Sequence, residues 1–221
     1  MEQLIQRHNS IVARTPVQFR RYMYNKIDWS NRMIGLTGPR GVGKTTLVLQ
    51  RIKQHLQGEK VLYVNMEDFY FTTHRLVDFA GQLSKRGYKY LFADEIHRYP
   101  DWSKELKLIY DYYPDLCVVF TGSSVLDIRK GVSDLSRRAV MYHMQGLSFR
   151  EYLEYAHGIV VPVHSLEQIL QQNAEVGAIE HPLAYFAEYL HNGYYPFASE
   201  SGYIEKLRQI VSMSVDADIP A

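Results

Sequence analysis

One stretch, Gly38–Thr46, constrains what this chain can fold into more than any other feature of its sequence. It reads GPRGVGKTT and contains the pattern G-x-x-x-x-G-K-[ST]. A short apolar run, Met33–Thr37, comes directly before it. The apolar residues that follow it at helical spacing are Leu47, Val48, Ile52 and Leu56. The order of strand, glycine-rich loop and helix is the arrangement that a phosphate-binding loop requires.

The residue types of this loop suit a triphosphate, which needs many hydrogen-bond donors without side-chain bulk. Gly38, Gly41 and Gly43 let the backbone turn its N–H groups inward, and the new helix directs its positive dipole end at the phosphates. Lys44 supplies a cation for the β- and γ-phosphates, and Thr45 offers a hydroxyl to Mg²⁺. The predicted nucleotide-binding residues are Gly38, Pro39, Arg40, Gly41, Val42, Gly43, Lys44, Thr45 and Thr46.

Strand and helix patterns alternate through the first part of the chain. The expected buried strands are Met33–Thr37, Val61–Asn65, Tyr90–Asp94, Cys117–Thr121 and Val140–Met144. An apolar stripe over residues 76–83 predicts a helix that is capped by Thr72 or Thr73 and stopped by Gly87. A second stripe predicts a helix that begins after Asp101. This alternation indicates an α/β fold with a parallel sheet that helices cover on both faces.

The strand patterns stop near residue 146, and the rest of the chain is acidic and helical. Ser148 with Glu151, and Ser165 with Gln168, have the pattern of capping boxes that open helices, and Pro182 fits the first position of a further helix. One face of the last helix carries Ile204, Leu207, Ile210 and Val211. We therefore expect a core at residues 1–146 and a helical segment at residues 147–221. Because no further segment of the sequence can cover that apolar face, we expect residues 147–221 to be the start of a longer region.

An apolar strand, Tyr90–Asp94, ends in two adjacent carboxylates about fifty residues after the loop. Asp94 is well placed to hold a water in the Mg²⁺ shell, and Glu95 to orient and polarise an attacking water. Alternatively, Glu95 caps the next turn or pairs with Arg98. An acid that acts on water favours hydrolysis over transfer to a small-molecule acceptor.

Small hydroxyl side chains end the fourth expected strand. Ser123 is the first candidate to sense the γ-phosphate and Thr121 the second, while a simple turn is the alternative. An arginine that reaches a nucleotide stabilises the transition state of phosphoryl transfer. Arg138 is the catalytic candidate, with Arg137 beside it, and both equally suit a solvated surface. Arg40 either contacts the phosphates or faces solvent.

The charge of the chain is polarised along its length. Residues 1–60 carry eleven Lys or Arg and three Asp or Glu, a net +8. Residues 151–221 carry two and ten, a net −8. The basic part is compatible with nucleic-acid binding and also with a solvated surface.

The sequence also limits the compartment and the metals. Cys117 is the only cysteine and is expected in the core, and no His or Cys pair has the spacing of a zinc site. No apolar run reaches the roughly 18 residues that span a bilayer, and the amino terminus lacks the hydrophobic stretch of a signal peptide. We expect a cytoplasmic protein without a membrane partner.

Several motifs together resemble one family. GPRGVGKTTL, LFADEIHRYPDW, FTGSS, GLSFREYL, NGYYP and DADIP are similar to AAA+-type P-loop ATPases of a broad bacterial and archaeal group. The resemblance implies a three-layer sandwich with a five-stranded parallel sheet in the order 5-1-4-3-2. It also implies that the chain continues into a helical lid, a winged-helix-like region and a further carboxy-terminal domain.

Carried over by position, the resemblance gives Lys44 and Thr45 to the phosphates and Mg²⁺, Asp94 to the metal shell, Glu95 to water and Ser123 to sensing. This sequence departs from the family pattern at two positions. Arg137 replaces a glycine before Arg138, and Asn192 replaces a glycine before Gly193. Asparagine tolerates the left-handed backbone that glycine adopts, so the second departure is the milder one.

The expected activity is ATP hydrolysis with Mg²⁺ that drives a conformational change in an attached or partner domain. Residues 10–21 are the expected contacts of the adenine. A homo-oligomer or a partner protein is compatible with the sequence. The alternatives are a signalling module gated by ATP or ADP and a DNA-associated ATPase, and a small-molecule kinase ranks lowest.

Overall fold

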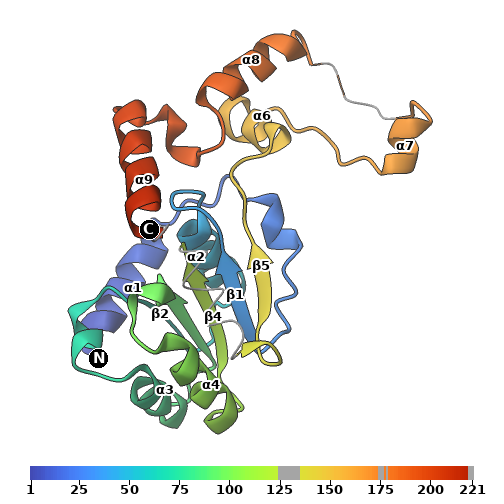
Figure 1. Cartoon of the computed structure of the whole chain (residues 1–221). Helices are drawn as coiled ribbons and strands as arrows, with labels where there is room; N and C mark the ends of the chain where they lie inside the picture. The colour runs from blue at the N-terminus through green and yellow to red at the C-terminus, as the bar shows by residue number, and fades with distance from the viewer. Residues whose placement is uncertain (124–134, 174–176, 178, 219–221) are drawn as a thin grey trace.

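The computed structural model describes residues 1–123, 135–173, 177 and 179–218. At its centre is a five-stranded sheet in which every pairing is parallel (Figure 1). The strands are β1 (Met33–Thr37), β2 (Val61–Asn65), β3 (Tyr90–Asp94), β4 (Cys117–Gly122) and β5 (Val140–His143). Their order is β2-β3-β4-β1-β5, which is the order implied by the family resemblance, read from the other edge.

Burial explains why most of the strands can be predicted from the sequence. Strands β1 to β4 are buried along most of their length, so each appears as a nearly continuous apolar run. Strand β5 differs, because within the described part of the chain it has only β1 beside it, and Val140 is 39% exposed. The expectation of a buried fifth strand is therefore wrong for its exposed residues, although Met144 just beyond it is fully buried.

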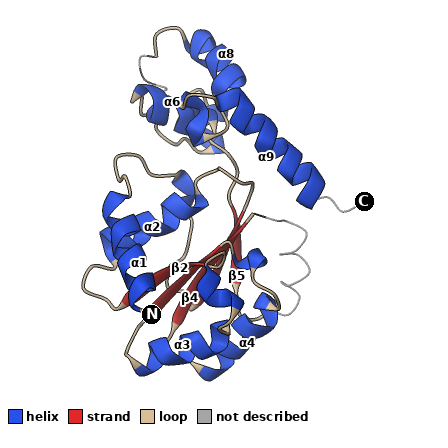
Figure 2. Cartoon of the chain, turned by 90° about the vertical axis from the view of Figure 1, so that its left-hand side faces the viewer, coloured by secondary structure: helices blue, strands red, loops and turns tan. Residues whose placement is uncertain are grey.

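Helices cover both faces of the sheet and complete a three-layer α/β sandwich (Figure 2). Helix α2 (Lys44–His55) packs on one face, and α3 (Leu76–Lys85) and α4 (Trp102–Tyr112) pack on the other. Side chains alternate along each strand, so Met33 belongs to the core under α3 and α4, and Ile34 to the core under α2. The predicted fold class is confirmed.

The amino-terminal helix α1 (Glu2–Arg14) was not expected from the sequence. Only Leu4 and His8 are buried in it, so its apolar signal is weak. The helix lies beside β2 and α2, where Nδ1 of His8 accepts a hydrogen bond of 3.0 Å from the backbone N–H of Tyr63. This contact fixes the start of the chain to one edge of the sheet.

One of the expected helix caps is wrong, and another is in place but makes no capping bond. Helix α3 has Arg75 at its N-cap, because Thr72 ends a 3-10 turn, Phe69–Thr72, and donates to the carbonyl oxygen of Phe69. Asp101 does occupy the N-cap position of α4, but its side chain makes no capping bond. Its carboxylate instead accepts a 2.7 Å hydrogen bond from Lys104.

The carboxy-terminal part contains helices and connecting loops but no strand in the residues that the structure describes, and it lies beyond the carboxyl ends of the strands (Figure 1). Its helices are α6 (Phe149–His157), α7 (Leu166–Leu170), α8 (Pro182–Asn192) and α9 (Tyr203–Asp218). Both predicted capping boxes are present, and Pro182 occupies the first turn of α8. The domain boundary after residue 146 stays a prediction, and the last residues of the DADIP motif lie outside the described part. None of the described helices is both long enough and apolar enough to cross a membrane.

Candidate functional site

The glycine-rich loop joins β1 to α2, as the sequence predicts. Gly38, Gly41 and Gly43 have φ angles of 148°, 84° and 98°, which lie in the region that glycine adopts without strain. A Cβ atom on Gly38 would lie 2.1 Å from the carbonyl oxygen of Met144, so a side chain has no room there. Successive backbone N–H groups in such a loop, followed by a helix N-terminus, form a concavity that binds anions.

Lys44 begins helix α2 and stays within the loop. Its ammonium donates hydrogen bonds of 2.8 Å to the carbonyl oxygen of Gly38 and 2.9 Å to that of Pro39. The residue is only 4% exposed. A compact cation is therefore held beside the N–H groups that open the helix, where the charge of a phosphate is best stabilised.

Asp94, at the end of β3, accepts hydrogen bonds from three hydroxyl groups. Oγ1 of Thr45 lies 2.8 Å and the phenol oxygen of Tyr63 2.7 Å from its Oδ2, and Oγ1 of Thr121 donates to its Oδ1. Burial, and then the charge of Asp94, raise the pKa of Tyr63 far above its ordinary value, so the phenol keeps its proton. The structure thus joins the loop to the acidic strand, as predicted, and adds Tyr63, which the sequence analysis missed.

Glu95 has a left-handed backbone with φ 53°, uncommon for a residue other than glycine and typical of functional sites. Its carboxylate accepts a 3.1 Å hydrogen bond from Oγ of Ser123, and Nδ1 of His97 lies 3.4 Å from the same oxygen. Of the alternatives for Glu95, it does occupy the N-cap position of the next turn, Ile96–Arg98, but its side chain makes no capping bond. Arg98 pairs with Glu67 instead of Glu95.

Arg138 lies at the other end of the sheet from the loop. It comes just before β5, whereas the loop follows the end of β1, and these two strands are parallel. Its guanidinium donates to both carboxylate oxygens of Asp111, at 2.9 and 3.0 Å, and this lowers the pKa of Asp111. Arg138 therefore does not join the site of its own chain, and a role at a neighbouring subunit stays a prediction. Arg137 is exposed, and Arg40 is partly exposed within the loop.

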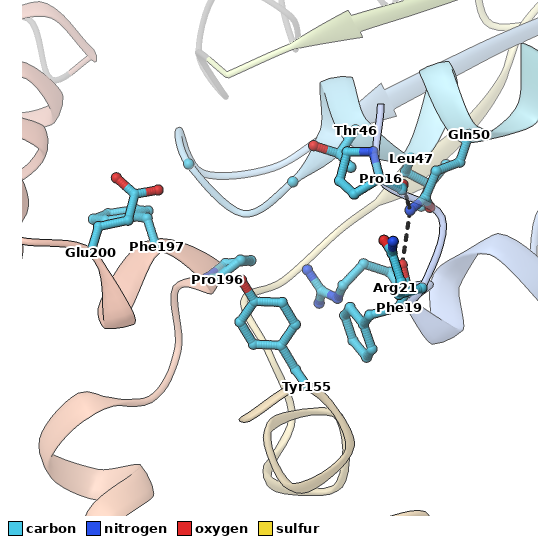
Figure 3. A pocket seen from close by; sticks show the side chains of 13 residues that line it. Pro16, Phe19, Arg21, Thr46, Leu47, Gln50, Tyr155, Pro196, Phe197 and Glu200 are labelled. Atoms are coloured by element: carbon cyan, nitrogen blue, oxygen red, sulfur yellow. Dashed lines mark hydrogen bonds between the residues drawn. The ribbon is translucent and has the colours of Figure 1, made fainter. Parts of the chain in front are cut away.

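A pocket of about 540 Å³ opens beside the loop (Figure 3). Three parts of the chain line it. The stretch before β1 contributes Pro16, Gln18, Phe19 and Arg21. The loop and α2 contribute Gly41, Gly43, Thr46, Leu47 and Gln50, and the helical segment contributes Tyr155, Pro196, Phe197 and Glu200. The pocket thus includes part of residues 10–21, where adenine contacts were expected.

Comparisons with known proteins agree with this arrangement. The sequence model of the family described as AAA domain matches residues 30–153. The uncharacterized protein MJ1637 of Methanocaldococcus jannaschii is 29% identical over 237 aligned residues, which cover 91% of this chain. The chain spans about half the length of that relative, 49%.

Two solved structures share the fold. The Hsp104–ADP complex of S. cerevisiae has a TM-score of 0.50 and 21% identity, over 92% of this chain and 33% of the other. The Walker-type ATPase PABY2304 of Pyrococcus abyssi has a TM-score of 0.53 and 12% identity, over 91% and 73%. The family match covers more than half of this chain and spans both the loop and the acidic strand. The chain therefore belongs to the AAA domain family of P-loop ATPases.

Proposed function

We propose that this chain binds ATP with Mg²⁺, hydrolyses it, and uses the cycle to change the conformation of an attached or partner domain. Membership of the AAA domain family supports the nucleotide-binding and ATPase part of this proposal. One observation carries it. The 2.8 Å hydrogen bond from Thr45 to Asp94 brings the phosphate loop and the acidic strand to one point, with Lys44 and Glu95 beside it.

The oxygen atoms at this point suit Mg²⁺, a hard cation that binds hydroxyl, carboxylate, phosphate and water oxygens. Thr45 would be a direct ligand, and Asp94 would hold water in the metal shell. When bound, the ion would neutralise charge that develops on the phosphates. Tyr63 and Thr121 orient the Asp94 carboxylate for this task, because each donates a hydrogen bond to it.

Glu95 is the proposed residue that orients and polarises the attacking water. Ser123 holds its carboxylate by a hydrogen bond and Nδ1 of His97 lies beside it. The Glu95 side chain is 17% exposed, so water can reach it. Ser123 was expected to sense the γ-phosphate. Its contact with Glu95 supports a role in which it couples the phosphate to the carboxylate that acts on water.

The pocket beside the loop is the proposed site of the adenine. Phe19 and Tyr155 supply aromatic surfaces whose ring centroids lie 5.0 Å apart, and Leu47 supplies an apolar wall. Flat apolar walls with a few polar groups suit a purine base. Cytoplasmic localisation and the size of any assembly stay predictions.

Two variants test this function by separating binding from turnover. Lys44→Ala removes the cation for the phosphates and is expected to abolish calorimetric binding of ADP and ATP. Glu95→Gln keeps the shape of the side chain but cannot accept the proton, so it is expected to bind ATP and release no phosphate. Turnover by Glu95→Gln at the wild-type rate would exclude Glu95 as the base. Absence of nucleotide binding by the wild type would refute the proposed function itself.

A further inference from the structure

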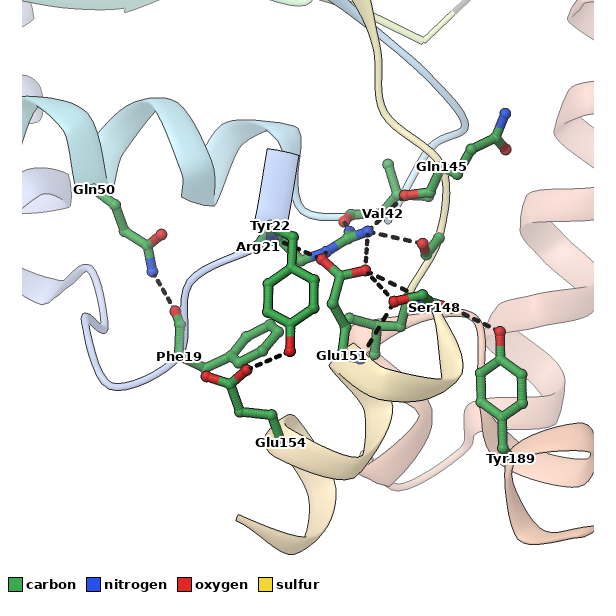
Figure 4. A network of polar contacts seen from close by, with 12 residues as sticks. Phe19, Arg21, Tyr22, Val42, Gln50, Gln145, Ser148, Glu151, Glu154 and Tyr189 are labelled. Carbon is green, nitrogen blue, oxygen red and sulfur yellow. Dashed lines mark hydrogen bonds and ion pairs between the residues drawn. The ribbon is translucent and has the colours of Figure 1, made fainter. Parts of the chain in front are cut away.

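Arg21 is a buried junction between three segments of the chain (Figure 4). Its Nη1 donates a 2.5 Å hydrogen bond to the carbonyl oxygen of Val42, within the phosphate loop. Its Nη2 donates at 2.8 Å to the carbonyl oxygens of Gln145 and Gly146, which follow β5. Its Nε lies 2.8 Å from Oε1 of Glu151, on helix α6. One planar guanidinium thus fixes the loop, the connection after β5 and the first helix of the helical segment relative to one another.

Glu151 is equally well held. The side chains of Arg21 and Glu151 are only 8% and 6% exposed. Beyond Arg21, the Glu151 carboxylate accepts hydrogen bonds from the backbone N–H of Tyr22, at 2.8 Å, and from the backbone N–H and hydroxyl of Ser148, both at 3.0 Å. A buried ion pair with this many partners has a defined geometry. Such a pair can fix one conformation even where it adds little to the free energy of unfolding.

Segments near this junction also form two walls of the pocket beside the loop. Gln50, on α2, donates to the carbonyl oxygens of Pro16 and Phe19 and so fixes the wall that precedes β1. On the opposite side, a Cβ atom on Gly41 would lie 2.7 Å from the ring of Phe197, so the helical segment rests directly against the loop (Figure 3). A molecule that occupies this pocket therefore contacts the core and the helical segment at once.

We propose that Arg21 and Glu151 are positioning residues that transmit nucleotide occupancy of the phosphate loop to the helical segment. The inference rests on the proposed nucleotide binding. Phosphates bind the N–H groups of the loop, and Arg21 holds a carbonyl oxygen of that loop, so a shift of the loop moves the guanidinium. Because the guanidinium is rigid, Glu151 and helix α6 follow it. A ligand shifts a conformational equilibrium only if it binds one conformation more tightly than the other. The Arg21–Glu151 pair defines the conformation in which both walls of the pocket contact the nucleotide.

The test is backbone hydrogen exchange of residues 149–157, measured by mass spectrometry with and without ADP. In the wild type we expect ADP to slow exchange in these residues several-fold. In Arg21→Met/Glu151→Leu the two charges are replaced together by apolar side chains of similar size, which a buried site tolerates far better than one unpaired charge. Because Arg21 also lines the pocket, this variant is expected to bind ADP more weakly. At ADP concentrations that saturate it in calorimetry, it is expected to lose the response of residues 149–157.

The matched control is Arg75→Met/Glu105→Leu, which removes another Arg–Glu pair, with 3.1 Å between Nε and Oε1, on the α3 and α4 side of the sheet. It is expected to keep the ADP response. Should the Arg21/Glu151 double variant fail to fold or to bind ADP, Arg21→Lys decides. Lysine keeps the charge but has no planar fork, so the response should fall at ADP concentrations that saturate this variant in calorimetry.

The outcomes separate this inference from the function on which it rests. No ADP binding by the wild type refutes the proposed function. If the wild type binds ADP and exchange in residues 149–157 does not change, the coupling is refuted while nucleotide binding stands. A full response in a folded double variant, or in Arg21→Lys when that variant has to decide, also refutes the coupling.

Discussion

At the scale of single residues, the Asp94 carboxylate is the most connected group of the site. It is 3% exposed and accepts hydrogen bonds from Thr45, Tyr63 and Thr121. A buried charge is tolerated only when such donors satisfy it. The three hydroxyls therefore keep a carboxylate inside the protein at the position where Mg²⁺ binding needs it.

Tyr63→Phe tests this account, because it removes one donor and leaves the ring in place. Losing a hydrogen bond to a charged group should lower the free energy of unfolding by roughly 1.5–3 kcal/mol, measured by urea denaturation. Tyr112→Phe is the control, since Tyr112 is 63% exposed and should change the free energy by less than about 0.5 kcal/mol. A Tyr63→Phe protein as stable as the wild type would show that Asp94 does not depend on the phenol.

The raised pKa of Tyr63 gives this effect a pH dependence. In the unfolded chain a tyrosine loses its proton near pH 10, whereas Tyr63 keeps its proton in the folded protein. The stabilisation is therefore complete below about pH 10 and declines above it. The difference in stability between wild type and Tyr63→Phe should shrink as the pH rises above about 10.

At the scale of elements, the loop and its helix depend on a backbone that only glycine provides. Gly38→Ala would place a Cβ atom 2.1 Å from the backbone oxygen of Met144, in addition to the strain of φ 148°. Displacing the loop should weaken ADP binding at least about tenfold, measured by calorimetry. Gly58→Ala is the control, because Gly58 has φ 92° but nothing within 4 Å of the added atom. It should cost about 1–2 kcal/mol of stability and leave ADP affinity unchanged.

The elements also show what the sequence can and cannot predict. The five strands are predicted to within about one residue, and for β1 to β4 the reason is that buried parallel strands are apolar throughout. The loop and the acidic pair are predicted because each is a continuous motif. The link between Arg21 and Glu151 is not, because 130 positions separate them in the chain, and Glu151 was recognised only as part of a capping box. Likewise, nothing local identifies Tyr63 as a partner of Asp94, since the contact exists only once β2 and β3 pair.

At the scale of the whole molecule, much of the basic charge of residues 1–60 is engaged by contacts within the chain. Most of its basic side chains contact groups of the same chain. Ion pairs or aromatic rings engage Arg7, Arg20, Arg21, Arg32 and Arg51. Backbone carbonyl oxygens engage Lys44, Lys53 and Lys60. The acidic helical segment supplies one of these partners, Glu151, so the two ends of the charge gradient meet within the fold.

This distribution predicts a weak response to DNA. Each lysine or arginine that neutralises a phosphate of a duplex favours binding, but a side chain that must first leave a partner within the chain contributes less to it. We therefore expect double-stranded DNA to leave ATP turnover unchanged at about 0.15 M salt, measured as phosphate release over a range of protein concentrations. Stimulation by DNA that falls steeply as salt is raised would contradict this expectation. It would show that the basic side chains exchange their internal partners for phosphates, as a DNA-associated ATPase requires.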